Sequence, residues 1–173
     1  MRKWVVTLVA VSALLGGCGS GVEGNAVAAE RWDPCSITPA AVAATGLDPA
    51  YRMEGWGKGV KVTDWGRCVF HAPGGVDYPY GLSVMSSVDH TIAEARANSS
   101  NRDGRDLKVG GRDAYMYKTD FGAAIRDCQV ALDVPSGVVV FAALYNKDDG
   151  VDACEVVLEH VQDLESAVPA APN

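Results

Sequence analysis

Apolar and polar side chains alternate from residue 127 to residue 134, in the clearest two-residue pattern of the chain. Successive side chains of a β-strand point to opposite faces, so this pattern predicts a half-buried strand of an antiparallel sheet, with Cys128 facing the core. A turn at residues 135–137 then leads into residues 138–145, an apolar run that predicts a more deeply buried strand. The apolar positions of the first strand are Cys128, Val130, Leu132 and Val134, and Asp127, Gln129, Ala131 and Asp133 lie between them.

The spacing of apolar residues changes to three or four between Val151 and Val168. This spacing predicts an amphipathic helix, with Asp149 or Asp152 capping its amino end. Cys154 lies on the apolar stripe, so the helix would bring it against the sheet. The stripe consists of Val151, Cys154, Val157, Leu158, Val161, Leu164 and Val168.

Shorter elements are predicted in the first two thirds of the chain. Thr38 is a good N-cap, Pro39 suits the first helical position and Gly46 suits the residue after the end, so a short helix is expected over residues 39–45. A middle helix is expected over residues 91–98. Strands are expected over residues 60–64, 67–71, 80–86 and 112–118, with turns at residues 73–75 and 110–111.

The amino terminus has the pattern of a bacterial lipoprotein signal. Arg2 and Lys3 precede an apolar run over residues 4–15, and Gly16 and Gly17 come directly before Cys18. The pattern predicts a signal over residues 1–17 and lipid attachment at Cys18, which would hold the protein on the extracytoplasmic face of the cell membrane. The alternatives are a retained membrane anchor, for which the apolar run is too short at about a dozen residues, and an ordinary signal that releases a soluble protein.

Four regions follow from this interpretation. Residues 1–17 form the signal, residues 18–30 the lipidated cysteine and a flexible tether of small residues, residues 31–168 a single globular domain, and residues 169–173 a disordered tail. The whole chain carries 15 basic and 22 acidic residues. Removing Arg2 and Lys3 leaves 13 basic residues and a net charge of −9, which makes nucleic acid an unsuitable partner.

Apart from Cys18, the chain contains four cysteines: Cys35, Cys68, Cys128 and Cys154. An even number in an oxidising compartment predicts two disulfides. The spacing fits no zinc motif, so no metal is expected. Four cysteines allow three connectivities, and local chain geometry favours Cys35 with Cys68 and Cys128 with Cys154.

These motifs together resemble the domain-of-unknown-function family 3558, a family of actinobacterial lipoproteins. The resemblance runs from Trp32 to Val168 and depends on the order of its motifs. It implies an extracytoplasmic α+β domain with two disulfides but no established activity. The expected fold is an antiparallel sheet with a short N-terminal, a middle and a long C-terminal helix packed on it, similar in outline to PsbP-like and Mog1-like domains. The motifs are Asp33-Pro34-Cys35, Trp65-Gly66-Arg67-Cys68, Gly110-Gly111-Arg112-Asp113-Ala114 and Asp152-Ala153-Cys154.

No catalytic constellation stands out in the sequence. The three histidines, His71, His90 and His160, are scattered, each is expected at the surface, and only His90 has a neighbouring carboxylate, Asp89. Neither acidic loop, at residues 99–104 or 147–152, matches a calcium motif, and no cofactor is expected.

Two residues are candidates for contact with a ligand or partner. Trp56 lies in a glycine-rich segment where an exposed tryptophan would be a good contact residue. His90 is the second. The alternative is structural, with Trp65 packed on the Cys35–Cys68 bridge and the other tryptophans covering the core edge.

Two functional hypotheses follow. The first is a membrane-anchored, non-enzymatic lipoprotein that binds an envelope protein or a small ligand. The second is an extracytoplasmic hydrolase for cell-wall or lipid substrates, which requires a pocket in which His90 binds both a carboxylate and a hydroxyl.

Overall fold

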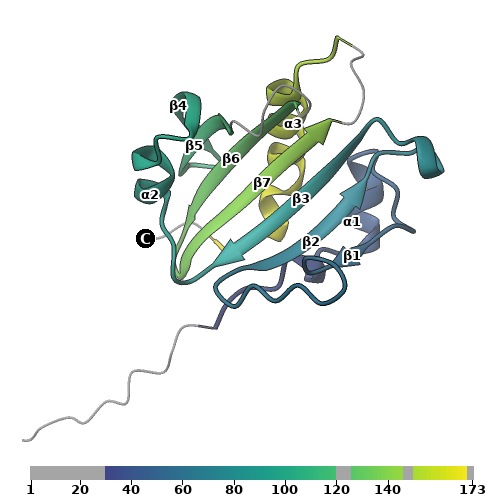
Figure 1. Ribbon diagram of the computed structural model, residues 1–173, viewed down its shortest axis with the longest axis horizontal. Coiled ribbons are helices and arrows are strands. Elements are labelled where there is room, and N and C mark those ends of the chain that lie inside the picture. The colour runs from purple at the N-terminus through teal and green to yellow at the C-terminus, as the bar shows by residue number, and fades with distance from the viewer. Residues whose placement is uncertain (1–29, 120–125, 146–149, 171–173) are drawn as a thin grey trace, which may run out of the picture.

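The computed structural model describes residues 30–119, 126–145 and 150–170. Its centre is a seven-stranded antiparallel sheet in the order β1-β2-β3-β7-β6-β5-β4, so the fold belongs to the α+β class, as predicted (Figure 1). The last strand, β7, lies between β6 and β3 and joins the two halves of the sheet. The strands are β1 (Met53–Glu54), β2 (Gly66–His71), β3 (Tyr80–Ser87), β4 (Asn101–Val109), β5 (Arg112–Thr119), β6 (Arg126–Val134) and β7 (Gly137–Tyr145).

Three α-helices accompany the sheet at the predicted places. These are α1 (Pro39–Ala44), α2 (Ile92–Ala97) and α3 (Ala153–Leu164). Each begins at a side-chain cap, which satisfies backbone N–H groups that lack a partner inside the helix. Thr38 caps α1, Asp152 caps α3, and Thr91 caps α2 in a reciprocal capping box with Glu94.

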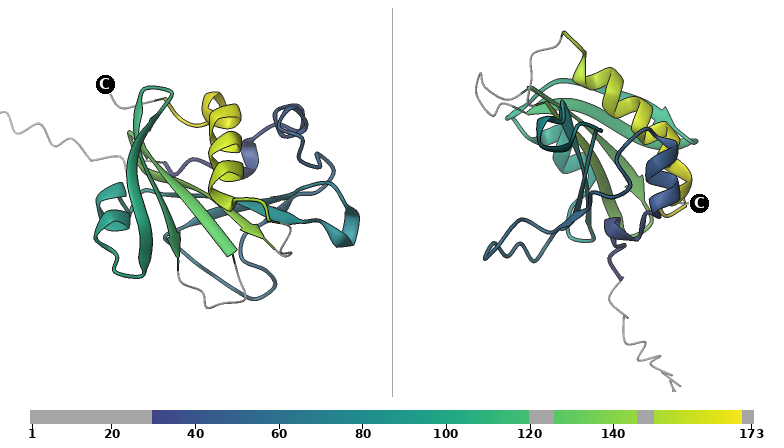
Figure 2. Two further views of the ribbon diagram at one scale, coloured as in Figure 1. Left: turned by 90° about the horizontal axis from the view of Figure 1, so that it is seen from above. Right: turned by 90° about the vertical axis from the view of Figure 1, so that its right-hand side faces the viewer.

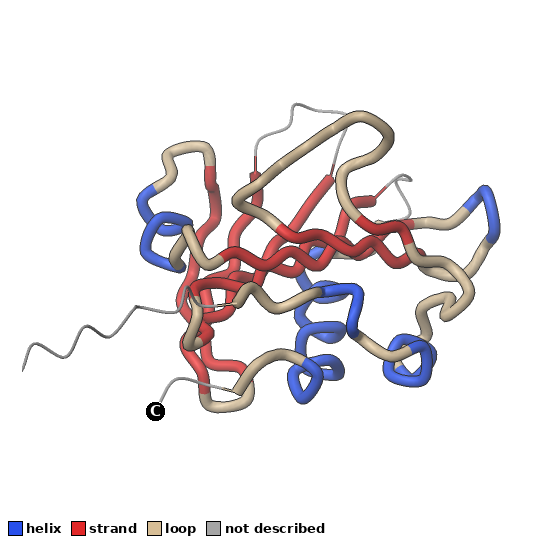
Figure 3. Tube along the Cα trace, turned by 90° about the horizontal axis from the view of Figure 1, so that it is seen from below, coloured by secondary structure: helices blue, strands red, loops and turns tan. Residues whose placement is uncertain are grey.

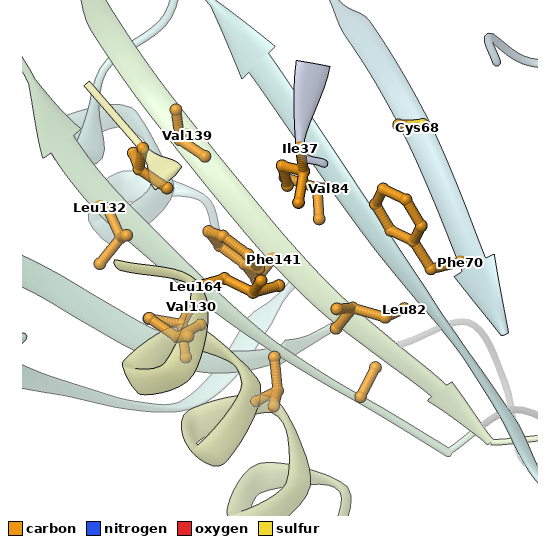
Figure 4. Packing of buried hydrophobic residues seen from close by; sticks show 14 of the residues in the cluster. Ile37, Cys68, Phe70, Leu82, Val84, Val130, Leu132, Val139, Phe141 and Leu164 are labelled. Atoms are coloured by element: carbon orange, nitrogen blue, oxygen red, sulfur yellow. The ribbon is translucent and has the colours of Figure 1, made fainter. Parts of the chain in front are cut away.

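The main core lies between the sheet and the helices α1 and α3, which cover the same face (Figure 2). Val157, Val161 and Leu164 of α3 are buried in one cluster with residues of β6 and β7. Figure 4 shows Phe141 near the centre of this cluster, and its side chain is fully buried. The main core therefore forms on the apolar face of β6, as its alternation predicts.

The opposite face of the sheet differs from the prediction. Asp127, Gln129 and Ala131 were predicted on an exposed face, but they are 5%, 8% and 0% exposed. A second, smaller cluster covers part of this face, where Ile92 of α2 packs with sheet residues and Trp65. Figure 3 shows the loop before β2 on the side of the sheet away from α1 and α3. The prediction of a half-buried strand was therefore wrong, because α2 covers the polar-looking face.

The predicted strand over residues 60–64 is also wrong, because this segment is a loop. Its carbonyl groups bind side chains instead of a neighbouring strand: Arg31 donates to the Thr63 carbonyl at 2.8 Å and Ser87 to the Asp64 carbonyl at 2.6 Å. A glycine with a φ of 81°, Gly59, directly precedes the segment and breaks the extended conformation.

Two strands of the sheet, β1 and β4, were not predicted. Strand β4 carries a run of charged residues and pairs with β5 on one side only, so it lacks the apolar alternation by which strands are recognised. A register shift between Arg102 and Arg105, with Asp103 at a φ of 53°, interrupts its pairing further. The predicted turn at Gly110 and Gly111 is confirmed, and both residues have the positive φ that a tight hairpin requires.

Two disulfides with the favoured connectivity hold a 3-10 turn at Pro34–Ser36 and helix α3 to the sheet. Cys35 bonds to Cys68 and Cys128 to Cys154. Cys128 is fully buried on β6, and its partner lies in the first turn of α3. Both disulfides and the described core lie between residues 34 and 168, so this part of the chain carries its own core.

The predicted signal and Cys18 lie outside the described residues, as does the tether except for Glu30. The described residues contain no helix that is long and apolar enough to cross a membrane. Pro169, the first residue of the predicted tail, accepts a hydrogen bond from buried Arg112 at 2.5 Å, and residues 171–173 lie outside the described part.

Candidate functional site

Trp65, just before β2, lines two cavities that together form the candidate site. The first has a volume of about 300 Å³ and lies between Trp65 and α2; it is called the His90 cavity. The second has a volume of about 470 Å³ and lies between the loop before β2 and the segment at residues 31–34; it is called the Trp56 cavity. The two predicted contact residues, Trp56 and His90, therefore line different cavities with a common wall.

The His90 cavity has an apolar floor and a polar rim. Val138 and Val140 of β7 form part of the floor, on the face of the sheet opposite the main core. The rim consists of hydroxyl and amide side chains that bind one another. Tyr117 donates to Gln129 at 3.1 Å, Gln129 donates to Thr119 at 2.9 Å, Thr119 donates to Asn101 at 3.3 Å, and Asn101 donates to the Ala95 carbonyl at 2.8 Å.

A buried carboxylate, Asp127, holds one end of this network. It accepts hydrogen bonds from the Gln129 side chain at 3.1 Å and from the Thr119 backbone at 3.1 Å. Burial nevertheless raises the pKa of Asp127 above its ordinary value, because desolvation outweighs these hydrogen bonds. Since the rim groups already have partners, the polar rim is rigid before any ligand arrives.

His90 closes the other side of the cavity and connects the loop before β2 to α2. Its Nε2 lies 2.8 Å from Asp64 and its Nδ1 lies 2.9 Å from Glu94. The ring stacks on Trp65 with the ring centroids 4.9 Å apart. The hydrogen bonds to Asp64 and Glu94 raise the pKa of His90 and lower the pKa of both carboxylates. We define His90, Asp64 and Glu94 as the His90 latch.

The latch should stabilise the protein most at mildly acidic pH. Because folding raises the pKa of His90 above 6.5, the stabilisation is fully present below about pH 6.5 and is lost as pH rises through the raised pKa. We expect the stability difference between the unchanged protein and His90→Gln to shrink between about pH 6 and about pH 9. Denaturant unfolding at both pH values, with an NMR titration of the His90 ring, measures this. A difference that stays constant with pH contradicts the prediction.

The Trp56 cavity combines cationic and aromatic side chains. Arg67 of β2 extends along it, donates to Ser83 at 2.8 Å and lies over the Trp56 ring, 5.0 Å from its centroid. Arg67 is half-buried, and this burial lowers the pKa of its guanidinium. The sequence left open whether Trp56 is an exposed contact or covers the core edge. It is half-buried, and its indole N–H is buried with no acceptor in the described part of the chain.

The other two histidines are buried, so the prediction that they lie at the surface was wrong. His71 is 9% exposed and stacks between Tyr51 and Tyr78. His160 is 4% exposed and its Nε2 lies 2.7 Å from the Tyr80 hydroxyl. Burial lowers the pKa of both rings and raises the pKa of Tyr80 to about 12. Aromatic neighbours keep both histidine rings away from water, and no local sequence pattern predicts this burial.

Comparison with known protein families identifies the family of this chain. A family model described as "Protein of unknown function (DUF3558)" matches residues 13–167. The chain belongs to this family. The resemblance stated from the motifs is thereby confirmed for this DUF3558 protein, whereas its actinobacterial lipoprotein character stays a prediction. No curated protein matches it.

Among solved structures, this DUF3558 protein is similar to the solution structure of cyanobacterial PsbP (CyanoP) from Synechocystis sp. PCC 6803. The sequence identity is 14%, the match covers 88% of this chain and 92% of that chain, and the TM-score is 0.38. A similarity of this size says nothing of activity. The Mog1-like part of the predicted outline stays a prediction.

The structure brings together residues of the DUF3558 protein that the sequence keeps apart. The predicted neighbour of His90, Asp89, is replaced by Asp64 and Glu94, and both ring nitrogens contact carboxylates with no hydroxyl bonded to either. Trp65 stacks on His90 and belongs to the second cluster, instead of the predicted position on the Cys35–Cys68 bridge. The described residues contain no cluster of His, Cys, Asp or Glu that could hold a metal.

Part of this site could be predicted from the sequence, and part could not. Glu94 lies four residues after His90 and three after the cap Thr91, a spacing that brings side chains together at the start of a helix. Asp64 lies 26 residues before His90, and Gln129 lies 28 residues after Asn101. No local pattern brings these residues together, and they become neighbours only through the arrangement of strands and loops in the fold.

Proposed function

We propose that this DUF3558 protein is a lipid-anchored, extracytoplasmic and non-enzymatic binding module that holds a small neutral ligand in the His90 cavity. The observation that carries the proposal is the combination of two surfaces in this cavity. Its floor is apolar, and the polar side chains around the floor are already hydrogen-bonded to one another. Binding sites for small molecules are concave, mostly apolar and largely formed in advance, with volumes from about 300 Å³ upward.

A neutral ligand fits these walls better than a charged one. The charges at the rim belong to the His90 latch, where Asp64 and Glu94 share one histidine, so the latch keeps a net charge of −1 when His90 is protonated. An anion would lie against Glu94, and a cation would compete with His90 for the same carboxylates. A ligand with an apolar body and a few hydroxyl or amide groups would cover Val138 and Val140 without breaking the latch.

The non-enzymatic part of the proposal is supported by the two nitrogens of His90. A histidine that activates a serine or threonine needs one nitrogen free to accept the hydroxyl proton, and a second group that orients the ring. Here both nitrogens face carboxylates, at 2.8 and 2.9 Å. This arrangement suits a latch between two segments better than a general base.

The ligand should be lost when the cavity is filled from its edge. Asn98, an exposed residue at the carboxyl end of α2, lines the cavity, and Ala97 beside it is exposed but does not line it. We expect native mass spectrometry of the protein purified from its own host to show a stoichiometric extra mass. Asn98→Trp should lower the fraction of protein that carries this mass at least ~tenfold, because the larger side chain takes contact area from the ligand. Ala97→Trp is the matched control and should keep the ligand.

Three outcomes contradict the proposal or a part of it. A clean mass without ligand for the unchanged protein, under gentle purification, removes the small-ligand function and favours a protein partner instead. An extra mass that survives in Asn98→Trp places the ligand outside the His90 cavity. Turnover of an envelope substrate that disappears in His90→Ala would contradict the non-enzymatic part.

A further inference from the structure

The described basic residues differ in whether they form ion pairs. Four of those in the later part of the chain are paired with carboxylates at 2.7 to 3.3 Å: Arg96 with Asp106, Lys108 with Asp113, Arg112 with Glu165 and Lys118 with Asp103. By contrast, no ion pair to another described residue is formed by Arg31, Arg52, Lys58, Lys61 or Arg67. In a chain of net charge −7, the amino-terminal end of the domain thus carries a group of cations that form no ion pair with another described residue.

Three of these cations, Arg31, Lys61 and Arg67, line the Trp56 cavity. Two carboxylates, Asp33 and Glu54, line it as well, so the cations exceed the carboxylates by one; Asp33 also caps the following turn, where it accepts from the Cys35 backbone at 2.8 Å. Charges that are partly removed from water are normally paired. An anionic group in this cavity would supply the partner that Arg67 lacks among the described residues.

The indole N–H of Trp56 is a second sign of a missing acceptor. It is buried, and it meets no acceptor in the described part of the chain. A buried donor without an acceptor is unfavourable and is rare in folded proteins. A phosphate group could accept from Arg31 and Lys61, which are exposed, and it could accept from this N–H once the Trp56 side chain shifts to expose it.

The cavity lies where the chain enters the domain. Arg31, the second described residue, binds the Thr63 carbonyl at 2.8 Å, and Figure 1 shows the start of the described chain beside the loop before β2. The tether predicted before it has about a dozen residues and a reach of roughly 20 Å. An anchor at Cys18 would therefore keep this end of the domain close to the bilayer.

The loop at residues 55–61 has the composition of a membrane-contacting tip. Val60 is 55% exposed, one of the few exposed large apolar side chains among the described residues. It lies between exposed Lys58 and Lys61. Basic residues near an anionic membrane are attracted to its surface, and an apolar side chain between them can enter the interface.

We propose that the Trp56 cavity and the loop at residues 55–61 dock the domain on an anionic phospholipid bilayer, with a lipid phosphate bound among Arg31, Lys61 and Arg67. The orientation rests on the lipid anchoring of the proposed function, because the anchor determines which end faces the membrane. The two cavities share only Trp65 among their lining residues, so a phosphate bound in the Trp56 cavity leaves the other walls of the His90 cavity unoccupied.

Vesicle binding of the chain from residue 18 onward, with Cys18→Ser so that no lipid is attached, tests the docking surface. We expect sedimentation with vesicles of phosphatidylglycerol and phosphatidylcholine but not with phosphatidylcholine alone, and loss of binding at high salt. The double variant Lys58→Glu with Lys61→Glu should weaken vesicle binding about 25-fold or more, because each lysine near an anionic surface strengthens binding roughly fivefold. The matched control is Lys108→Glu with Lys118→Glu, which makes the same change in charge on β4 and β5 and should bind like the unchanged chain.

Three results would overturn the proposal. The first is equal binding to neutral and anionic vesicles, and the second is equal weakening in the two double variants, which would mean that net charge alone matters. The third is binding of soluble glycerol phosphate, followed by tryptophan fluorescence, without binding to vesicles. Because this assay uses a chain without lipid, its failure is separate from failure of anchoring or of ligand binding. Asn98→Trp should bind vesicles normally.

Discussion

Cys18→Ser is expected to move the protein from the membrane fraction to the soluble envelope fraction when cells are fractionated at high salt, which also releases the docking surface. The thiol of Cys18 is the group that would form the bond to lipid, and a hydroxyl at the same position would not replace it. Stable membrane attachment needs two or more acyl chains, which the processed amino terminus of a bacterial lipoprotein carries. The docking surface around the Trp56 cavity is too weak to replace them, because its attraction is that of a few cations screened by salt.

Fractionation of cells together with labelling by a palmitate analogue measures this effect. Ser20→Ala, two residues away in the predicted tether, is the control and should stay labelled and membrane-bound. Persistence of Cys18→Ser in the membrane fraction would favour a retained membrane anchor. A soluble, unlabelled unchanged protein would favour an ordinary cleaved signal. Each of these results contradicts the lipoprotein interpretation.

Removal of the Cys128–Cys154 disulfide should cause a large loss of stability. The bond joins residues 26 positions apart and fixes the first turn of α3 to β6. In the chain-entropy model, opening a loop of this size lowers the free energy of unfolding by about 3 to 4 kcal/mol. For a domain of this size, the melting temperature should fall by roughly 10 °C.

Cys128→Ala with Cys154→Ala, compared with the unchanged protein by denaturant unfolding, tests this prediction. Cys35→Ala with Cys68→Ala is a useful second variant, because that bond closes a loop of similar length, 33 residues, but holds a 3-10 turn and not a helix of the main core. Only the first variant should make α3 more sensitive to proteolysis, since Val157, Val161 and Leu164 depend on it for docking. A loss below about 1 kcal/mol would show that core packing alone holds α3.

The helices and the caps of α1 and α3 were well predicted from the sequence, whereas the cap of α2 and some strands were not. The N-caps of α1, α2 and α3 and the apolar stripe of α3 involve residues at most four positions apart, so the sequence contains the whole pattern. A strand is only half specified by its own residues, because its stability comes from its neighbours. The segment at residues 60–64 has strand-like residues but no partner strand, whereas charged β4 has β5 beside it.

In the candidate site, too, contacts between nearby residues could be predicted from the sequence, whereas contacts between distant residues could not. The proximity of His90 to Glu94 follows from the start of α2, but its proximity to Asp64 and Trp65 requires the loop before β2 to fold over the sheet. Trp56 was singled out as an exposed contact. Its burial against Arg67 and its lack of an acceptor are consequences of tertiary packing.

The sequence by itself determined the family, the α+β class, the places of the helices and the four cysteines that pair. These features depend on short-range periodicity, capping and residue type, which act over a few positions. The tertiary structure decided which face of β6 is covered, which carboxylates hold His90 and which cations remain without an ion pair. Those outcomes depend on the placement of β7 between β3 and β6, which brings distant segments together through burial of apolar surface.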